Sequence, residues 1–286
     1  MPAATIRLFL IHGDPKRLRT AEISNWNGKA FAAPRTEFDL FLKREEGGQS
    51  GVYILTGTHP DTEAPTAYIG EAEVLRDRMK AHKDKEFWVQ AIAFVSKDEN
   101  LTKAHIRFLE GRLITEAQQI GRFTLDNGQA SGSKLPESDR ADMEVFLDKI
   151  RQLLPVLGSE LLTPIVKHET SAKSTGDLTC TIKGLEAKGN RTSTGFVVYA
   201  DSHAVLKERP SAAKQHAMVV ENRKKLVSNG TLVQDGDHYR FTKNTEFSSP
   251  SAAAAVVHGG GANGLLVWKD RRGRPLKEIE EEGSNN

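Results

Sequence analysis

The sequence has 286 residues, of which 38% are hydrophobic and 27% charged, and its formal net charge is +2. This composition is typical of a globular protein with room for two domains, and it excludes wholesale disorder and nucleic-acid binding by bulk charge alone. The single cysteine, Cys180, excludes an internal disulfide framework. No apolar run near the start is long enough to span a membrane, so we expect a cytoplasmic protein with no membrane partner.

Residues 1–48 are expected to form an N-terminal βα extension. Short strands are predicted around residues 7–11 and 19–23. A helix is predicted to begin at Thr36 and to carry Phe38, Phe41 and Leu42 on its apolar face.

Residues 49–165 interleave strand and helix patterns. The predicted order is a strand at 51–55, a strand at 66–70, a helix at 71–83, a strand at 89–95, a helix at 101–119 and a helix at 139–154. Such interleaving predicts an α/β (α+β) domain with a small three-stranded sheet flanked by helices.

Two tyrosine-containing tripeptides lie on the first two of these strands, Gly51-Val52-Tyr53 and Tyr68-Ile69-Gly70. Either one alone is ordinary strand composition. On the next predicted helix, Arg78 and His82 are four residues apart, a spacing that places both on one helix face.

The longer helix after them carries a second polar set. Lys103, Arg107 and Glu110 follow a spacing that again shares one face, and Asn127 lies downstream in Leu-Asp-Asn-Gly. Each of these residues alone has a structural explanation, such as a solvated helix face or a helix-end histidine favoured by the dipole. The ordered set favours a functional site.

This set resembles the GIY-YIG nuclease family over residues 50–128, with Val52 in place of the isoleucine of the name motif. The segments at 1–46 and 88–158 resemble a bacterial subgroup of that family that carries an accessory domain of unknown function behind the nuclease. The resemblance therefore implies a GIY-YIG-like catalytic domain at residues 49–165.

The resemblance implies a divalent-metal-dependent endonuclease that hydrolyses phosphodiester bonds in nucleic acid, and we favour DNA over RNA as the substrate. By this likeness Tyr53 is the general base, Arg78 contacts the phosphate, and Glu110 binds the metal, expected to be Mg²⁺ with Mn²⁺ as a substitute. Tyr68 and His82 position water or relay protons. The supporting positions are Gly70, Lys103 and Asn127. The alternative is a catalytically inactive nucleic-acid-binding or partner-docking protein on a nuclease fold.

The second half is expected to contain a linker and first strand at 166–190, a small α+β accessory domain at 191–270 and a flexible tail at 271–286. A helix at 211–228, a hairpin at 231–242 and a helix capped by Ser249 or Ser251 are predicted within it.

Several residues of this accessory domain are candidates for contact with DNA. The phrase Ser-Pro-Ser-Ala-Ala-Ala, followed by Asn-Gly and then Trp-Lys, resembles small modules on bacterial nucleases and restriction-associated methylases. The candidates for phosphate contact or base stacking are Arg223, Lys224, Lys225, Trp268 and Lys269. A solvated helix face explains the basic run equally well.

Overall fold

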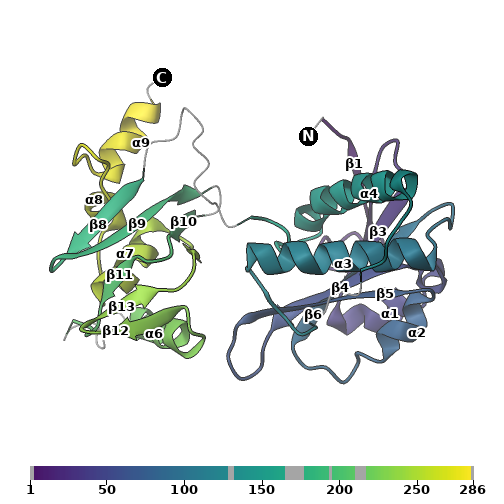
Figure 1. Cartoon of the computed structure of the whole chain (residues 1–286), viewed down its shortest axis with the longest axis horizontal. Coiled ribbons are helices and arrows are strands. Elements are labelled where there is room, and N and C mark those ends of the chain that lie inside the picture. The colour runs from purple at the N-terminus through teal and green to yellow at the C-terminus, as the bar shows by residue number, and fades with distance from the viewer. Residues whose placement is uncertain (1–2, 128–131, 165–176, 193–194, 210–216, 285–286) are drawn as a thin grey trace. The chain divides into compact units, whose positions relative to one another are not determined.

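The computed structural model describes residues 3–127, 132–164, 177–192, 195–209 and 217–284, and these build a mixed fold of helices and three sheets (Figure 1). The chain divides into two compact units, Met1–Pro164 and Ile165–Asn286. The predicted linker at 166–176 lies outside the described residues. Within the described residues, no helix is long and apolar enough to cross a membrane.

The first unit is built on one sheet of seven strands in the order β1-β2-β3-β6-β4-β5-β7, in which only β5 and β7 pair in parallel. Its strands and helices are β1 (Ile6–Leu10), β2 (Arg19–Ile23), β3 (Gly28–Pro34), α1 (Phe38–Leu42), β4 (Gly51–Thr58), β5 (Pro65–Ala72), α2 (Leu75–Lys80), β6 (Trp88–Ser96), α3 (Lys103–Ile120), β7 (Thr124–Leu125) and α4 (Glu137–Val156). Short 3-10 turns occupy Arg35–Glu37 and Glu45–Gly48.

The expectation of a three-stranded sheet is therefore wrong. The unpredicted strand β3 pairs with β2 on one side and β6 on the other, so residues 1–48 contribute three strands to the same sheet. Its sequence, Gly-Lys-Ala-Phe-Ala-Ala-Pro, is alanine-rich and buried on both faces, so it lacks the alternation that identifies a half-exposed strand.

The two faces of the sheet are covered by different helices. Helices α3 and α4 lie over one face and α1 and α2 over the other (Figure 1). Along β4, Val52 and Ile54 face the core shared with α3 and α4, whereas Tyr53 and Leu55 face the core shared with α1 and α2. This division follows from the two-residue period of a strand. It places the two motif tyrosines on the face covered by α2.

The segment between β5 and β6 differs from the prediction of one helix over 71–83. Strand β5 runs to Ala72, and α2 covers only Leu75–Lys80. His82 therefore lies on a turn beyond the helix, and the expectation that it shares a helix face with Arg78 is wrong. Helix α3 lies close to its predicted position, with Thr102 as N-cap and Gly121 in the left-handed conformation at its end.

The second unit contains a four-stranded sheet, β14-β10-β9-β8, and a three-stranded sheet, β11-β13-β12. Its elements are β8 (Leu178–Ile182), β9 (Leu185–Thr192), β10 (Gly195–Val198), β11 (His203–Val205), α6 (Ala217–Ser228), β12 (Leu232–Asp235), β13 (His238–Phe241), β14 (Thr245–Phe247), α7 (Pro250–His258), α8 (Gly264–Val267) and α9 (Leu276–Ser284). The predicted hairpin and the Ser249 cap of α7 are confirmed. Residues 211–216 of the predicted helix at 211–228 lie outside the described residues.

The expectation of a flexible tail at 271–286 is wrong for its described part. Helix α9 covers Leu276–Ser284, and Leu276 and Ile279 are buried in the core of this unit. These two apolar side chains are three residues apart on one helix face, a signal that the acidic residues around them obscured. Residues 285–286 lie outside the described residues.

Candidate active site

The two motif tyrosines lie side by side on neighbouring strands. Leu55 of β4 is directly opposite Tyr68, and Tyr53 is directly opposite Gly70 on β5. The rings of Tyr53 and Tyr68 are stacked with their centroids 6.0 Å apart. A Cβ atom at Gly70 would lie 2.5 Å from Cζ and Oη of Tyr53, so only glycine leaves room for this ring.

His82 completes this cluster from the turn after α2. Its Nε2 lies 2.7 Å from the Tyr53 hydroxyl, and its ring centroid is 4.4 Å from that of Tyr68. The Trp88 indole N–H donates a 2.9 Å hydrogen bond to the His82 carbonyl and so fixes the backbone there. The three aromatic rings therefore form one buried cluster.

Burial sets the protonation of this cluster. It lowers the pKa of His82 to about 4, with the nearby charges of Lys85 and Arg78 acting in the same direction. Burial also raises the pKa of Tyr53 well above its ordinary value, and the charge of Arg78 offsets only part of that rise. At neutral pH the Tyr53 hydroxyl is therefore protonated and the imidazole is neutral, and the imidazole tautomer decides which of the two donates in their hydrogen bond. In the tautomer whose Nε2 accepts, the ring proton belongs to Nδ1, which is buried and has no hydrogen-bond partner among the described residues.

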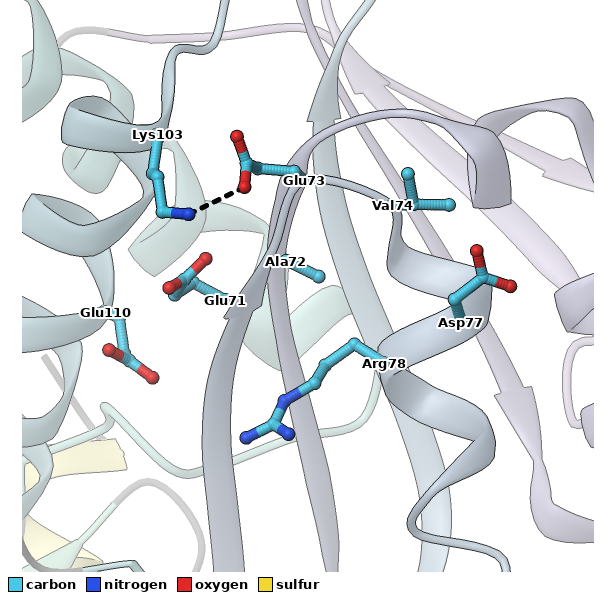
Figure 2. A pocket seen from close by; sticks show the side chains of 8 residues that line it. All are labelled: Glu71, Ala72, Glu73, Val74, Asp77, Arg78, Lys103 and Glu110. Atoms are coloured by element: carbon cyan, nitrogen blue, oxygen red, sulfur yellow. Dashed lines mark hydrogen bonds and ion pairs between the residues drawn. The ribbon is translucent and has the colours of Figure 1, made fainter.

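Arg78 extends from α2 into an open cavity of about 530 Å³ beside the edge of β5. Glu71 of β5 and Glu110 of α3 line the same cavity, and Figure 2 shows both carboxylates and the guanidinium directed into it. The pKa of Arg78 is raised first by its electrostatic interaction with Tyr53. Arg78 is thus the charged group that lies between the aromatic cluster and the two carboxylates.

Glu71 is a site residue that the sequence analysis missed. Burial, and then the negative charge of Glu110, raise the pKa of the Glu71 carboxyl. The sequence predicts a helix that begins at residue 71, whereas Glu71 lies within β5, on the side of the strand that faces α3. The available signal was the strand pattern itself, since Glu71 falls two residues after Ile69 and so shares its face.

The two predicted supporting polar residues have other partners. Lys103 forms an exposed 2.7 Å ion pair with Glu73 at the rim of the cavity (Figure 2). The Asn127 side chain accepts a 3.1 Å hydrogen bond from the Ile69 backbone N–H and donates to the carbonyl of the same residue. Asn127 therefore continues the short pairing of β7 along the edge of β5, a structural role.

The donor set fits a hard divalent cation. Glu71 and Glu110 offer carboxylate oxygens, which are the ligands Mg²⁺ takes in small numbers together with water and substrate phosphates. Their mutual repulsion, visible in the raised pKa of Glu71, would be relieved by such a cation. Among the described residues, no group of three or more His, Cys, Asp or Glu side chains is arranged to hold a metal by itself. A cation here would therefore need further oxygen atoms from water or from a substrate.

Two predicted nucleic-acid contacts in the second unit are wrong. Arg223 is 1% exposed, and its guanidinium donates to the carbonyls of Val205, Leu206 and Val256. Trp268 is fully buried; its indole N–H donates a 3.0 Å hydrogen bond to the Pro250 carbonyl. Both side chains hold the core of this unit together, so neither reaches a phosphate or a base.

The other three predicted contacts, Lys224, Lys225 and Lys269, do not share this burial. Lys224 and Lys269 are exposed and Lys225 is half-buried. Their contact with nucleic acid stays a prediction.

Comparison of the sequence with models of known protein families gives a match within the second unit only. Residues 178–280 match the family described as Domain of unknown function (DUF4357). This range begins at β8 and ends within α9, so it includes the strand pair β8–β9 and much of the helix that was predicted to be a tail. No curated protein and no solved structure matches the chain.

Proposed function

We propose that the first unit is a divalent-metal-dependent phosphodiesterase of the GIY-YIG type, acting as an endonuclease on DNA. The observation that carries the proposal is the hydrogen bond between the Tyr53 hydroxyl and neutral His82, beside a cavity lined by Arg78, Glu71 and Glu110. These residues come from β4, β5, α2, α3 and the turn after α2. Tyr53, Arg78, His82 and Glu110 are the positions to which the resemblance to the GIY-YIG family assigns roles. Glu71 is an additional residue of the proposed site.

The chain's own residues account for the proton transfer. Because Tyr53 is protonated, it can take a proton from an attacking water only as its own proton passes to Nε2 of His82. Neutral His82 accepts that proton in the tautomer whose own proton is on Nδ1, and Tyr68 packs against both rings. Tyr53 and His82 thus act as one base rather than two.

The remaining proposed roles are contact with the phosphate, by Arg78, and binding of the cation, by Glu71 and Glu110. The guanidinium of Arg78 presents a planar fork of donors to phosphate oxygens, where negative charge increases during the reaction. Glu71 and Glu110 would hold the cation, expected to be Mg²⁺. When bound, that ion would stabilise negative charge on the phosphate and the leaving oxygen.

The second unit supports this assignment by association. DUF4357 is an accessory domain often seen in proteins of the GIY-YIG type. Exposed Lys224 and Lys269 are the residues of this unit that we propose for contact with DNA phosphates.

The test is nicking of supercoiled plasmid DNA by the full chain in Mg²⁺ and in EDTA. We expect cleavage only with the metal, and Glu110→Gln should abolish it while leaving DNA binding intact. Glu144→Gln is the matched control, because Glu144 forms a surface ion pair with Arg112 on the neighbouring helices α3 and α4. Cleavage that persists in Glu110→Gln, or absence of metal-dependent cleavage in the unaltered protein, would contradict the proposal.

A further inference from the structure

An ion pair lies on the outer side of the aromatic cluster, between Lys85 and Asp126. Lys85 is three residues beyond His82, and its ammonium lies 4.9 Å from the centroid of the Tyr68 ring. Asp126 follows β7, where its backbone N–H donates a 2.8 Å hydrogen bond to the Ala67 carbonyl on β5. The pair therefore joins two segments that are 41 residues apart in the sequence.

The polar and charged groups around His82 come from every segment that packs on it. Tyr53 is on β4, Tyr68 on β5, Arg78 on α2, Lys85 on the turn before β6, and Asp126 after β7. Lys85 and Arg78 disfavour a positive charge on the imidazole, whereas Asp126 favours one. Arg78 faces the cavity, so Lys85 and Asp126 are the two groups that can adjust His82 without touching the proposed substrate site.

We propose that Lys85 and Asp126 are positioning residues for His82, which together hold Tyr68 against the imidazole that accepts the Tyr53 proton. This inference rests on the proposed function, which assigns the proton acceptor to His82. The Lys85 charge adds to the burial of the ring in disfavouring the protonated imidazole. Asp126 anchors the Lys85 ammonium over Tyr68 and moderates its effect.

This arrangement makes opposite predictions for the two halves of one ion pair. Lys85→Gln removes a positive charge, so His82 should become easier to protonate. Asp126→Asn removes a negative charge, so His82 should become harder to protonate. Each side chain is about one third exposed, so solvent screening keeps the expected shift of the His82 pKa small in either direction.

The experiment is an NMR titration of the His82 ring in the full chain, with the signal assigned from its loss in His82→Gln. At pH 4.5 the protonated fraction of His82 should rise in Lys85→Gln and fall in Asp126→Asn relative to the unaltered protein. Lys83→Gln is the matched control, since Lys83 is two residues away and pairs with Asp39, and it should leave the titration unchanged. Shifts in the same direction for both variants, or no shift in either, would overturn the inference.

A second measurement separates this inference from the proposed function. The acidic limb of the plasmid-nicking rate should move to higher pH in Lys85→Gln and to lower pH in Asp126→Asn. If the unaltered protein cleaves no DNA, the proposed function fails while the NMR titration still tests the electrostatic effect of the pair on His82. If it cleaves DNA and the limb does not move, the positioning role fails while the nuclease proposal stands.

Discussion

Acid should destabilise the first unit through His82, and the size of the effect follows from its burial. His82 is 4% exposed, and its pKa falls from the ordinary 6.5 to about 4 in the folded state. The unfolded chain therefore binds a proton on this residue between pH 6.5 and 4, whereas the folded chain does not. Folding stability from this group is fully present above pH 6.5 and is lost as the pH falls toward 4. Between pH 7.5 and pH 5 the loss is about 2 kcal/mol.

The measurement is the free energy of unfolding of the first unit at pH 7.5, 6 and 5, obtained from hydrogen exchange of peptides that cover β4 and β6. These strands lie in the centre of the first sheet, so their slowest amides report unfolding of this unit alone. Other groups titrate over the same range. The difference between the unaltered protein and His82→Gln therefore isolates the contribution of His82. We expect the variant to lose about 2 kcal/mol less than the unaltered protein between pH 7.5 and 5. Equal pH dependence in the two proteins would refute the assignment of a buried, neutral His82.

Three further substitutions test the packing around the site and in the second unit. Gly70→Ala should destabilise the first unit by about 1–3 kcal/mol and impair cleavage, because its Cβ meets a buried tyrosine ring at 2.5 Å. Gly132→Ala, in open space, should change stability by less than about 0.5 kcal/mol, with both variants compared with the unaltered protein by urea titration. Asn127→Ala should cost about 1–3 kcal/mol by removing two hydrogen bonds to a strand edge, which faster hydrogen exchange at Ile69 would report. Trp268→Ala should destabilise the second unit by about 3–5 kcal/mol, whereas Leu266→Ala, at a half-exposed position, should have a small effect in thermal unfolding.

Local patterns predicted the elements that carry the aromatic cluster. The strands with Tyr53 and Tyr68 have clear turn signals around them, and α3 has a cap and a regular apolar face. The extent of the sheet could not be predicted in this way. Strand β3 is buried on both faces and its residues have weak strand preference, so its place depends on contacts with β2 and β6 that are distant in the sequence.

Burial of polar and aromatic residues was the second quantity that local sequence did not supply. Arg223 and Lys224 are adjacent in one basic run, yet Arg223 is buried on backbone carbonyls and Lys224 is exposed. Neighbouring residues of a helix point about 100° apart, so a run of like charges cannot lie entirely on one surface. The arginine is the member suited to the interior, because its several donors can satisfy several carbonyls at once.

Glu71 shows how one misplaced boundary changes a candidate site. With residue 71 at the start of a helix, the site would offer a single carboxylate from Glu110 to a cation. With β5 continuing to Ala72, strand alternation directs Gly70 toward Tyr53 and Glu71 toward α3, so the two carboxylates line one cavity. The same two residues of β5 therefore serve both halves of the proposed site. Gly70 makes room for Tyr53, the proposed base, and Glu71 would add a second oxygen ligand for the proposed cation. The proposed chemistry therefore depends on the path of this strand.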